Sequence, residues 1–311
     1  MNTQVKGCSR RKFLKAGAAA ALAYGLAPTR GIAARPALIK KKIPSSGEQL
    51  SVIGLGTSRT FNVDSSSAAQ SPLLAVMQAF FDHGGQLIDS SPMYGSAEAV
   101  TGVLLQNVSN KTRLFSATKV WTNGKNQGID QMRRSMQRLG VDQIDLMQIH
   151  NLRDWQVHLE TLQEWKARGK IRYLGITTSH GRDHDELETI LQQHALDFVQ
   201  FSYNIEDREV ERRLLPLAQE RGIATLINRP YQRGSLFHKV RGKPLPDWAT
   251  EIDCASWGQF FLKFIASHPA VTCIIPATSK LKHMLDNMGA GYGGLPDAPT
   301  RRRMIEYLES I

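Results

Sequence analysis

The chain contains 311 residues, 41% of them hydrophobic, and its 39 Lys and Arg residues against 28 Asp and Glu give a formal net charge of +11. This is enough apolar sequence to bury a substantial core, in one large domain or two small ones. The charge does not indicate a nucleic-acid partner, because the basic runs 40–42 and 301–303 have no interleaved aromatic residues and are typical of a solvated surface.

An export leader is predicted in residues 1–33. Arg10 and Arg11 stand in Ser-Arg-Arg-Lys-Phe-Leu-Lys, and the apolar run 16–27 that follows is too short to span a bilayer. The pattern resembles the bacterial twin-arginine leader, whose translocation (Tat) machinery exports folded proteins to the periplasm. Cleavage after Ala33 would leave 34–311 as a single mature domain, and the loss of six basic residues lowers the formal net charge to +5. No other segment is long and apolar enough to serve as a membrane anchor.

The cysteine and histidine spacings do not indicate a metal site. Cys8 leaves with the leader, and Cys273 lies in the apolar run 271–275 and is expected to be a buried strand residue, so we expect Cys273 and Cys254 to be free thiols. A bridge between them in an oxidising compartment is the alternative. His180 and His184 are four residues apart in a polar loop, which favours a solvated pair over a pair of metal ligands.

Eight short apolar runs alternate with helical patterns along the rest of the chain. Between the runs lie amphipathic stretches such as 128–139, in which Met132 and Leu139 share one face with other apolar residues while arginines point to water. This alternation predicts an α/β fold of the closed, parallel (β/α)8 TIM-barrel type. An open dinucleotide-binding sheet suits the sequence less well, because the first run ends Ile-Gly-Leu-Gly-Thr-Ser without a third glycine. The eight runs are 52–55, 86–89, 114–118, 144–149, 172–177, 198–201, 224–228 and 272–275.

Two further segments stand out. Residues 37–50 hold two β-compatible runs around the turn residues 44–47, which predicts an N-terminal hairpin that closes the barrel floor. The longest connection, 230–253, carries several Gly and Pro residues, and connections of that length are usually functional or mobile.

Four different ionisable residues are predicted at the rim of this barrel. The second strand ends in Asp89, with Tyr94 in the loop that follows; the third ends near Lys119 and the fourth in His150. Each residue alone is explained by capping, packing or solvation. Together they indicate an active site, because the C-terminal strand ends of such barrels meet at one face.

Proton donation by Tyr94 is the chemistry that fits this set. A free phenol has a pKa near 10, and an adjacent ammonium group such as that of Lys119 lowers it. Asp89 would hold Lys119 in place, while His150 would hydrogen-bond a carbonyl oxygen and orient it toward Tyr94. A carbonyl that receives a proton on oxygen needs a hydride on carbon.

The motifs around these residues resemble those of the aldo/keto reductases, in order, from about Ala37 to Met304. They are Ile-Gly-Leu-Gly-Thr, Ile-Asp-Ser-Ser-Pro-Met-Tyr-Gly-Ser-Ala-Glu, Ser-Ala-Thr-Lys, Arg-Leu-Gly-Val-Asp-Gln-Ile-Asp-Leu-Met-Gln-Ile-His and Arg-Gly-Lys-Ile-Arg-Tyr-Leu-Gly. The resemblance implies a (β/α)8 barrel that uses NADPH to reduce an aldehyde or ketone, with the catalytic tetrad on Asp89, Tyr94, Lys119 and His150.

The same resemblance implies a cofactor site along the rim, with NADPH favoured over NADH because hydroxyl groups and a cation are available for a 2′-phosphate. The nicotinamide end is implied at Thr57, Thr177, Thr178, Gln200, Asn228, Arg229, Pro230 and Tyr231, the pyrophosphate at Gly234 and Leu236, and the adenosine end at Thr278, Ser279, Lys280, Asp286 and Asn287.

The sequence departs from the family pattern in two places. Thr177-Thr178 replaces the usual Ser-Asn, and Asn228 stands where many members stack an aromatic ring on the nicotinamide, a role that the nearby Tyr231 could take over. Met93, Trp121 and Trp155 are expected to line an open substrate pocket. Because a nicotinamide cofactor binds only the assembled barrel, export in the folded state would let the protein carry it. Two alternatives stay open: a binding or regulatory module without turnover, and a cofactor-independent isomerase or lyase.

Overall fold

The structure, a computed structural model, describes residues 1–3, 37–64, 66–111 and 114–311. Residues 37–311 form one compact unit. The predicted leader falls on residues that lie, from residue 4 onward, outside the described ones. Within the described part of the chain, no helix has both the length and the apolar character needed to cross a bilayer.

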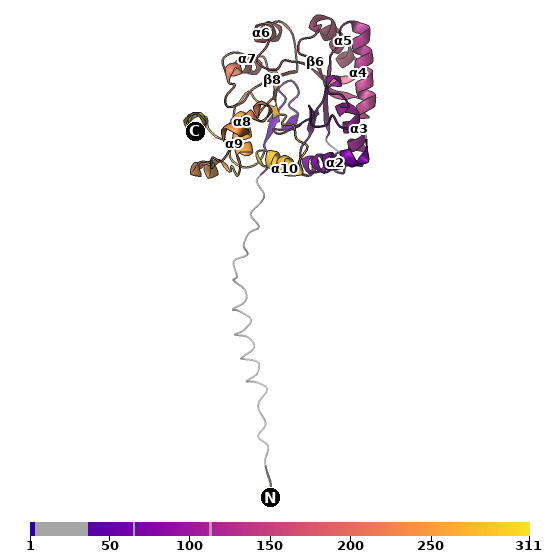
Figure 1. The fold of residues 1–311 in the computed structure, drawn as a ribbon. Helices are drawn as coiled ribbons and strands as arrows, with labels where there is room; N and C mark the ends of the chain where they lie inside the picture. The colour runs from indigo at the N-terminus through magenta and orange to yellow at the C-terminus, as the bar shows by residue number, and fades with distance from the viewer. Residues whose placement is uncertain (4–36, 65, 112–113) are drawn as a thin grey trace. The chain divides into compact units, whose positions relative to one another are not determined.

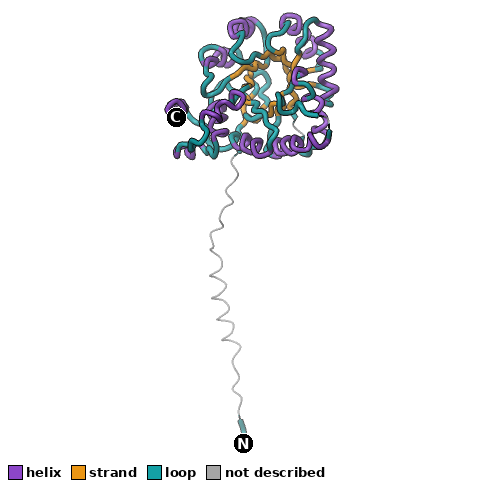
Figure 2. Tube along the Cα trace, viewed as in Figure 1, coloured by secondary structure: helices purple, strands orange, loops and turns teal. Residues whose placement is uncertain are grey.

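Eight parallel strands form the predicted barrel, as the ring of strands in Figure 2 shows. Each strand pairs with the next one along the chain, and the ring closes where the Gly54 amide donates to the Ile274 carbonyl at 2.8 Å and the Ile274 amide to the Val52 carbonyl at 2.9 Å. All eight predicted runs contribute a strand, although the first strand shares only Leu55 with its predicted run, 52–55, and the second and last strands are shorter than predicted. The strands are β3 (Leu55–Gly56), β4 (Leu87–Asp89), β5 (Phe115–Val120), β6 (Ile144–His150), β7 (Ile171–Thr177), β8 (Phe198–Ser202), β9 (Ala224–Asn228) and β10 (Cys273–Ile274).

A layer of helices surrounds the barrel (Figure 1). In α4 (Lys125–Leu139), Met132 and Leu139 are buried while the arginines between them are exposed, as the amphipathic pattern predicts. The helix ends at Gly140, whose φ of +69° lets its amide donate to the Met136 carbonyl. The remaining helices are α2 (Ser67–Asp82), α3 (Ala97–Asn107), α5 (Trp155–Ala167), α6 (His184–Gln193), α7 (Leu214–Glu220), α8 (Ser235–Lys239), α9 (Trp257–Ala266), α10 (Leu281–Gly289) and α11 (Ala298–Ser310).

The predicted N-terminal hairpin is formed by β1 (Lys40–Lys42) and β2 (Gln49–Ser51), which pair antiparallel. Its apolar residues Ile43 and Leu50 are buried with strand residues such as Phe115 in the barrel interior. Glu48 of the hairpin accepts a hydrogen bond from the hydroxyl group of Tyr173 at 2.7 Å. The hairpin therefore fills and ties down one end of the barrel, and the other end is left for the strand-end residues.

The long connection 230–253 is not structureless. It contains the short helices η3 (Gln232–Gly234), α8 and η4 (Asp247–Ile252). Both cysteines of the described residues, Cys254 and Cys273, are buried and unbridged.

Candidate active site

The ends of three neighbouring strands bring the predicted residues together. Asp89 is the last residue of β4, Lys119 is the next to last of β5, and His150 is the last of β6. Tyr94 closes the short helix η1 (Pro92–Tyr94), which follows β4 directly. Because these strands are parallel and adjacent, their C-terminal ends lie at one rim, and all four side chains meet there.

Lys119 and Asp89 form an ion pair with 2.6 Å between Nζ and Oδ2, and both side chains are buried, with 0% and 3% exposed. The ammonium group also donates to the carbonyl of Ser90 at 2.7 Å. The other carboxylate oxygen of Asp89 accepts from the side-chain amides of Gln148 and Gln200 at 3.0 and 3.1 Å. A buried ion pair needs such additional partners, and here both charges have them.

Tyr94 lies between this pair and His150. Lys119 Nζ is 5.2 Å from the centre of the Tyr94 ring, and the ring meets that of His150 edge-on, at 5.8 Å and 88°. Burial raises the pKa of Tyr94, and the positive charge of Lys119 works in the opposite direction. In the absence of ligand the phenol therefore holds its proton firmly, and the predicted acidifying effect of Lys119 is present but outweighed by burial.

Lys119 and His150 each keep one protonation state at neutral pH. Burial alone would lower the pKa of Lys119, but the charge of Asp89 overcomes it and the pKa is raised. Burial and the positive charge of Lys119 lower the pKa of His150 to about 3. At neutral pH the site thus holds a positively charged Lys119 and a neutral His150. The neutral imidazole can donate one hydrogen bond, and it adds no second positive charge beside Lys119.

The residues implied for the nicotinamide end adjoin the ion pair. Thr57 donates through its hydroxyl group to the carbonyl of Asp89 at 3.0 Å, and Gln200 contacts the carboxylate as described. Asn228 donates to the carbonyl of Thr178 at 3.0 Å. Thr177 accepts a hydrogen bond from the amide of Asn151, which follows His150. The hydroxyl oxygen of Thr178 is buried and has no partner among the described residues.

The loop after β9 contributes a second unpaired group. Arg229 has a φ of +52° and its Nη1 is buried with no partner among the described residues. Burial lowers the pKa of Arg229, and the nearby positive charges of Arg233 and Arg59 lower it further. Pro230 and Leu236 of this loop are buried, whereas Gly234, with a φ of +96°, takes a backbone conformation that favours glycine. Unpaired buried donors at this position fit an anionic ligand such as a pyrophosphate.

Tyr231 is held by contacts with α8 and α10. Its hydroxyl group donates to Asn287 of α10 at 2.7 Å, and its ring packs against Phe237 at 4.8 Å. Tyr231 therefore joins the β9 loop to α10.

The residues implied for the adenosine end surround the start of α10. Thr278 is buried and accepts from the amide of Lys280 at 3.1 Å, whereas Ser279 and Lys280 are exposed. Asp286 accepts hydrogen bonds from Ser256, which caps α9, at 2.7 and 2.8 Å. Asp286 is therefore engaged in holding two helices together, and the exposed hydroxyl and ammonium groups of residues 279 and 280 are available to a ligand.

Sequence reasoning missed two buried polar residues of the site. Gln148 is completely buried and holds Asp89 in place, and Ser91 bonds His150 through its hydroxyl group at 3.0 Å. Gln148 lies two residues before His150 on the same strand and so faces the same side of it, a signal that strand alternation offers. Ser91 gives no such signal, because a serine beside a proline also suits a plain turn.

Two of the three predicted apolar wall residues lie near the site. The Trp121 ring is 6.4 Å from that of His150 and 4.8 Å from the guanidinium group of Arg153, and Met93 is 47% exposed. Trp155 was assigned wrongly to the wall. Its indole donates to Glu186 at 2.8 Å and its ring packs on His194, so it belongs to the helical layer at α5 and α6.

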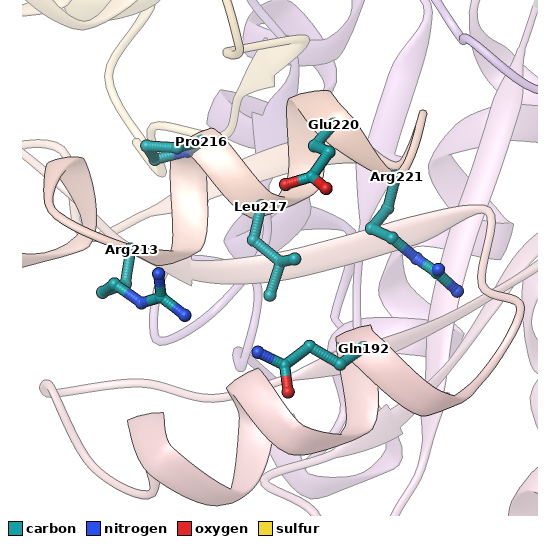
Figure 3. Close-up of a pocket in the computed structure, with 6 residues that line it drawn as sticks. All are labelled: Gln192, Arg213, Pro216, Leu217, Glu220 and Arg221. Atoms are coloured by element: carbon teal, nitrogen blue, oxygen red, sulfur yellow. The ribbon is translucent and has the colours of Figure 1, made fainter.

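A separate pocket lies in the helical layer between α6 and α7 (Figure 3). None of the strand-end residues lines it, and Arg213 at its edge is paired with Glu188 of α6. It is therefore a groove between helices and not part of the candidate site. The lining residues are Gln192, Arg213, Pro216, Leu217, Glu220 and Arg221.

Comparison with known proteins agrees with this geometry. Residues 52–298 match the model of the aldo/keto reductase family. Over 213 residues the chain is 28% identical to aldo-keto reductase YhdN of Bacillus subtilis (strain 168), covering 64% of this chain and 63% of that protein. It is 29% identical over 197 residues to the NADH-specific methylglyoxal reductase of Escherichia coli (strain K12), covering 53% and 58%. Each of these two alignments thus spans less than two thirds of the relative.

An aldo-keto reductase of Klebsiella pneumoniae, solved in complex with NADPH, shares the fold with a TM-score of 0.70 at 23% identity, covering 87% of this chain and 96% of that one.

Proposed function

Because the chain belongs to the aldo/keto reductase family, we propose that it is an NAD(P)H-dependent oxidoreductase that reduces the carbonyl group of a small aldehyde or ketone to an alcohol. The observation that carries this proposal is the buried Lys119–Asp89 ion pair beneath Tyr94, beside a neutral His150. A site that packs a fixed cation, a protonated phenol and an uncharged hydrogen-bond donor around one opening is suited to protonating a carbonyl oxygen.

Each side chain has one task in the reaction. His150 donates a hydrogen bond to the carbonyl oxygen and sets its direction, and Tyr94 gives the oxygen its proton. Lys119 stabilises the phenolate that Tyr94 becomes, while Asp89, fixed by Gln148 and Gln200, keeps the ammonium group in place. A nicotinamide cofactor, when bound, would supply the hydride for the carbonyl carbon. The proton lost by Tyr94 is then restored from solvent at the mouth.

The unpaired groups of the site support a nicotinamide cofactor. The buried hydroxyl oxygen of Thr178 and the buried Nη1 of Arg229 lack partners in the described part of the chain, and a carboxamide and a pyrophosphate would satisfy them. We propose NADPH as the preferred form, because Ser279 and Lys280 offer an exposed hydroxyl group and a cation for a 2′-phosphate. One relative is NADH-specific, so the test must include both nucleotides.

The test is a titration followed by a substrate screen. Quenching of tryptophan fluorescence by NADPH and NADH measures whether a nucleotide binds, and oxidation of the bound nucleotide is then followed with a panel of aldehydes, ketones and quinones. Binding with turnover supports the reductase. Binding without turnover of any carbonyl would favour a regulatory module, and no binding of either nucleotide would favour the cofactor-independent alternative.

Export to the periplasm in the folded state is proposed from the sequence around Arg10 and Arg11. A nucleotide bound to the barrel would cross with it, because only a folded passenger keeps a ligand that binds the native state. Mass spectrometry of protein released from the periplasm should detect the nucleotide. The paired substitution Arg10→Lys and Arg11→Lys should leave the uncleaved protein in the cytoplasm, and normal export of that variant would refute the route.

A further inference from the structure

The hydroxyl group of Ser91 lies 3.0 Å from Nδ1 of His150, and the two residues are 0% and 6% exposed. Ser91 directly precedes η1, the short helix that carries Tyr94. It therefore contacts the ring of His150 and begins the turn that carries Tyr94, the two residues that, under the proposed function, meet the carbonyl oxygen.

The backbone around Ser91 restricts what its hydroxyl group can do. The amide of Met93 donates to Ser91 Oγ at 3.2 Å, which caps η1 and occupies one lone pair of the oxygen. The amide of Tyr94 donates to the Ser91 carbonyl at 3.0 Å. Because an amide can only donate, the proton of the Ser91 hydroxyl group remains free for another acceptor.

Two tautomers of His150 meet this hydroxyl group differently. With the proton on Nε2, Nδ1 is an acceptor and takes the Ser91 proton, so both groups are satisfied. With the proton on Nδ1, Ser91 Oγ accepts twice, and its own buried proton has no acceptor among the described residues. A buried donor without a partner is costly, which favours the first arrangement.

The other ring nitrogen, Nε2, makes no hydrogen bond to any described residue and is not among their buried, unpartnered atoms. Nε2 therefore lies on the small part of His150 that is exposed. If Nε2 carries the proton, His150 can donate to a carbonyl oxygen; if it does not, His150 can only accept and would repel that oxygen.

We propose that Ser91 is a positioning residue that fixes His150 in the tautomer protonated on Nε2, while capping the turn that carries Tyr94. The mechanistic consequence rests on the proposed reductase function, but the tautomer itself is a property of the resting protein.

The first experiment reads the tautomer without any turnover. In ¹⁵N-labelled protein at pH 7, the His150 signals are assigned by their loss in His150→Gln. We expect Nδ1 to resonate as the unprotonated nitrogen and Nε2 as the protonated one. A protonated Nδ1 in the wild-type protein would overturn the proposal.

The second experiment compares S91D with S91N, which have nearly the same shape and are equally good caps. The amide of S91N accepts from Met93 and donates to Nδ1, whereas the carboxylate of S91D can only accept and draws the proton to Nδ1. We expect kcat for a carbonyl substrate to fall about a hundredfold in S91D, the effect of losing one donor to the developing oxyanion. S91N and Ser91→Thr should stay within about threefold of wild type.

Equal losses in S91D and S91N, with His150 in the same tautomer in both, would contradict the proposal. The affinity for NADPH should stay within about twofold in every variant, because the hydrogen bonds of Ser91 to described residues go to His150, Met93 and Tyr94 and not to the implied nucleotide residues. If the wild-type protein turned over no carbonyl while the tautomer shifted in S91D, the reductase function would fail and the positioning role would stand.

Discussion

The two sides of the barrel mouth differ in how far their polar groups are already satisfied. On the reaction side, defined by Asp89, Tyr94, Lys119 and His150, both charges of the ion pair have partners within 3.1 Å. On what we propose as the nucleotide side, defined by Arg229, Ser279 and Lys280, a buried guanidinium nitrogen has no partner among the described residues and two side chains are exposed.

This difference separates two kinds of work. A group that must stabilise charge during a reaction is most effective when it is fixed beforehand, and the reaction side is fixed without any ligand. A group that only binds a ligand can stay unpaired or exposed until that ligand arrives. Substitutions on the reaction side should therefore affect rate and folding, and those on the nucleotide side should affect affinity alone.

The largest effect is expected for Lys119→Met. It removes the charge that stabilises the Tyr94 phenolate and leaves the Asp89 carboxylate buried without its cation, which costs about 3–5 kcal/mol of the free energy of unfolding. Activity should be lost, and urea denaturation should show the destabilisation. Adding Asp89→Asn to the same chain should restore most of the stability but none of the activity. If Lys119→Met alone were as stable as wild type, the buried ion pair would not be needed for folding, and the proposed difference between the two sides would be wrong.

Tyr94→Phe should slow carbonyl reduction by about 10²–10⁴-fold, the usual contribution of a general acid, while leaving NADPH affinity nearly unchanged. Tyr173→Phe is a matched control, because Tyr173 bonds Glu48 at the hairpin end of the barrel. It should alter stability slightly and turnover not at all. Steady-state kinetics and fluorescence titration separate the two effects, and full activity in Tyr94→Phe would refute the mechanism.

The fold could be predicted from the sequence because the alternation of apolar runs and amphipathic helices is local. All eight strands and the hairpin follow from such patterns, and strand ends such as Asp89 and His150 could be assigned to one rim by topology alone. The boundaries of the short strands β3 and β10 could not, since their pairing is set by barrel closure, which no local pattern records.

The sequence predicted which residues form the catalytic set, but not all of the hydrogen bonds that hold them in place. Ion pairing of Lys119 with Asp89 follows from charge, but the contacts of Gln148 and Ser91 depend on which side chains face each other across strands. Trp155 was misassigned because an aromatic residue shortly after a strand end suits both the mouth and the helical layer. The pKa of Tyr94 was also out of reach, because it is decided by burial.

A smaller effect concerns the pH dependence of the reaction side. An ordinary histidine titrates near 6.5, whereas the pKa of His150 is lowered to about 3 and that of Tyr94 is raised. Reduction needs His150 neutral and Tyr94 protonated, so kcat/KM should show no step near pH 6.5 and should fall only at alkaline pH, as Tyr94 loses its proton. A profile measured between pH 5 and 10 should therefore be level, because the raised pKa of Tyr94 puts the loss of its proton beyond that range, and a loss of activity on going from pH 7 to 6 would contradict this.

The smallest effect is expected on the nucleotide side, for Lys280→Met. The ammonium group of Lys280 is exposed, so its contact with a 2′-phosphate is screened by water and salt and should be worth about tenfold in affinity, or about 1.4 kcal/mol. The dissociation constant of NADPH should rise by that factor, while that of NADH, which lacks the phosphate, stays within about twofold.

Lys282→Met is the matched control for the general loss of a positive charge, because Lys282 is also exposed and lies two residues further along the chain. If the two variants weakened NADPH equally, the effect would be one of overall charge. If only Lys280→Met did so, and the difference shrank as salt was added, the result would show that NADPH binds this side of the mouth through the exposed ammonium group of Lys280.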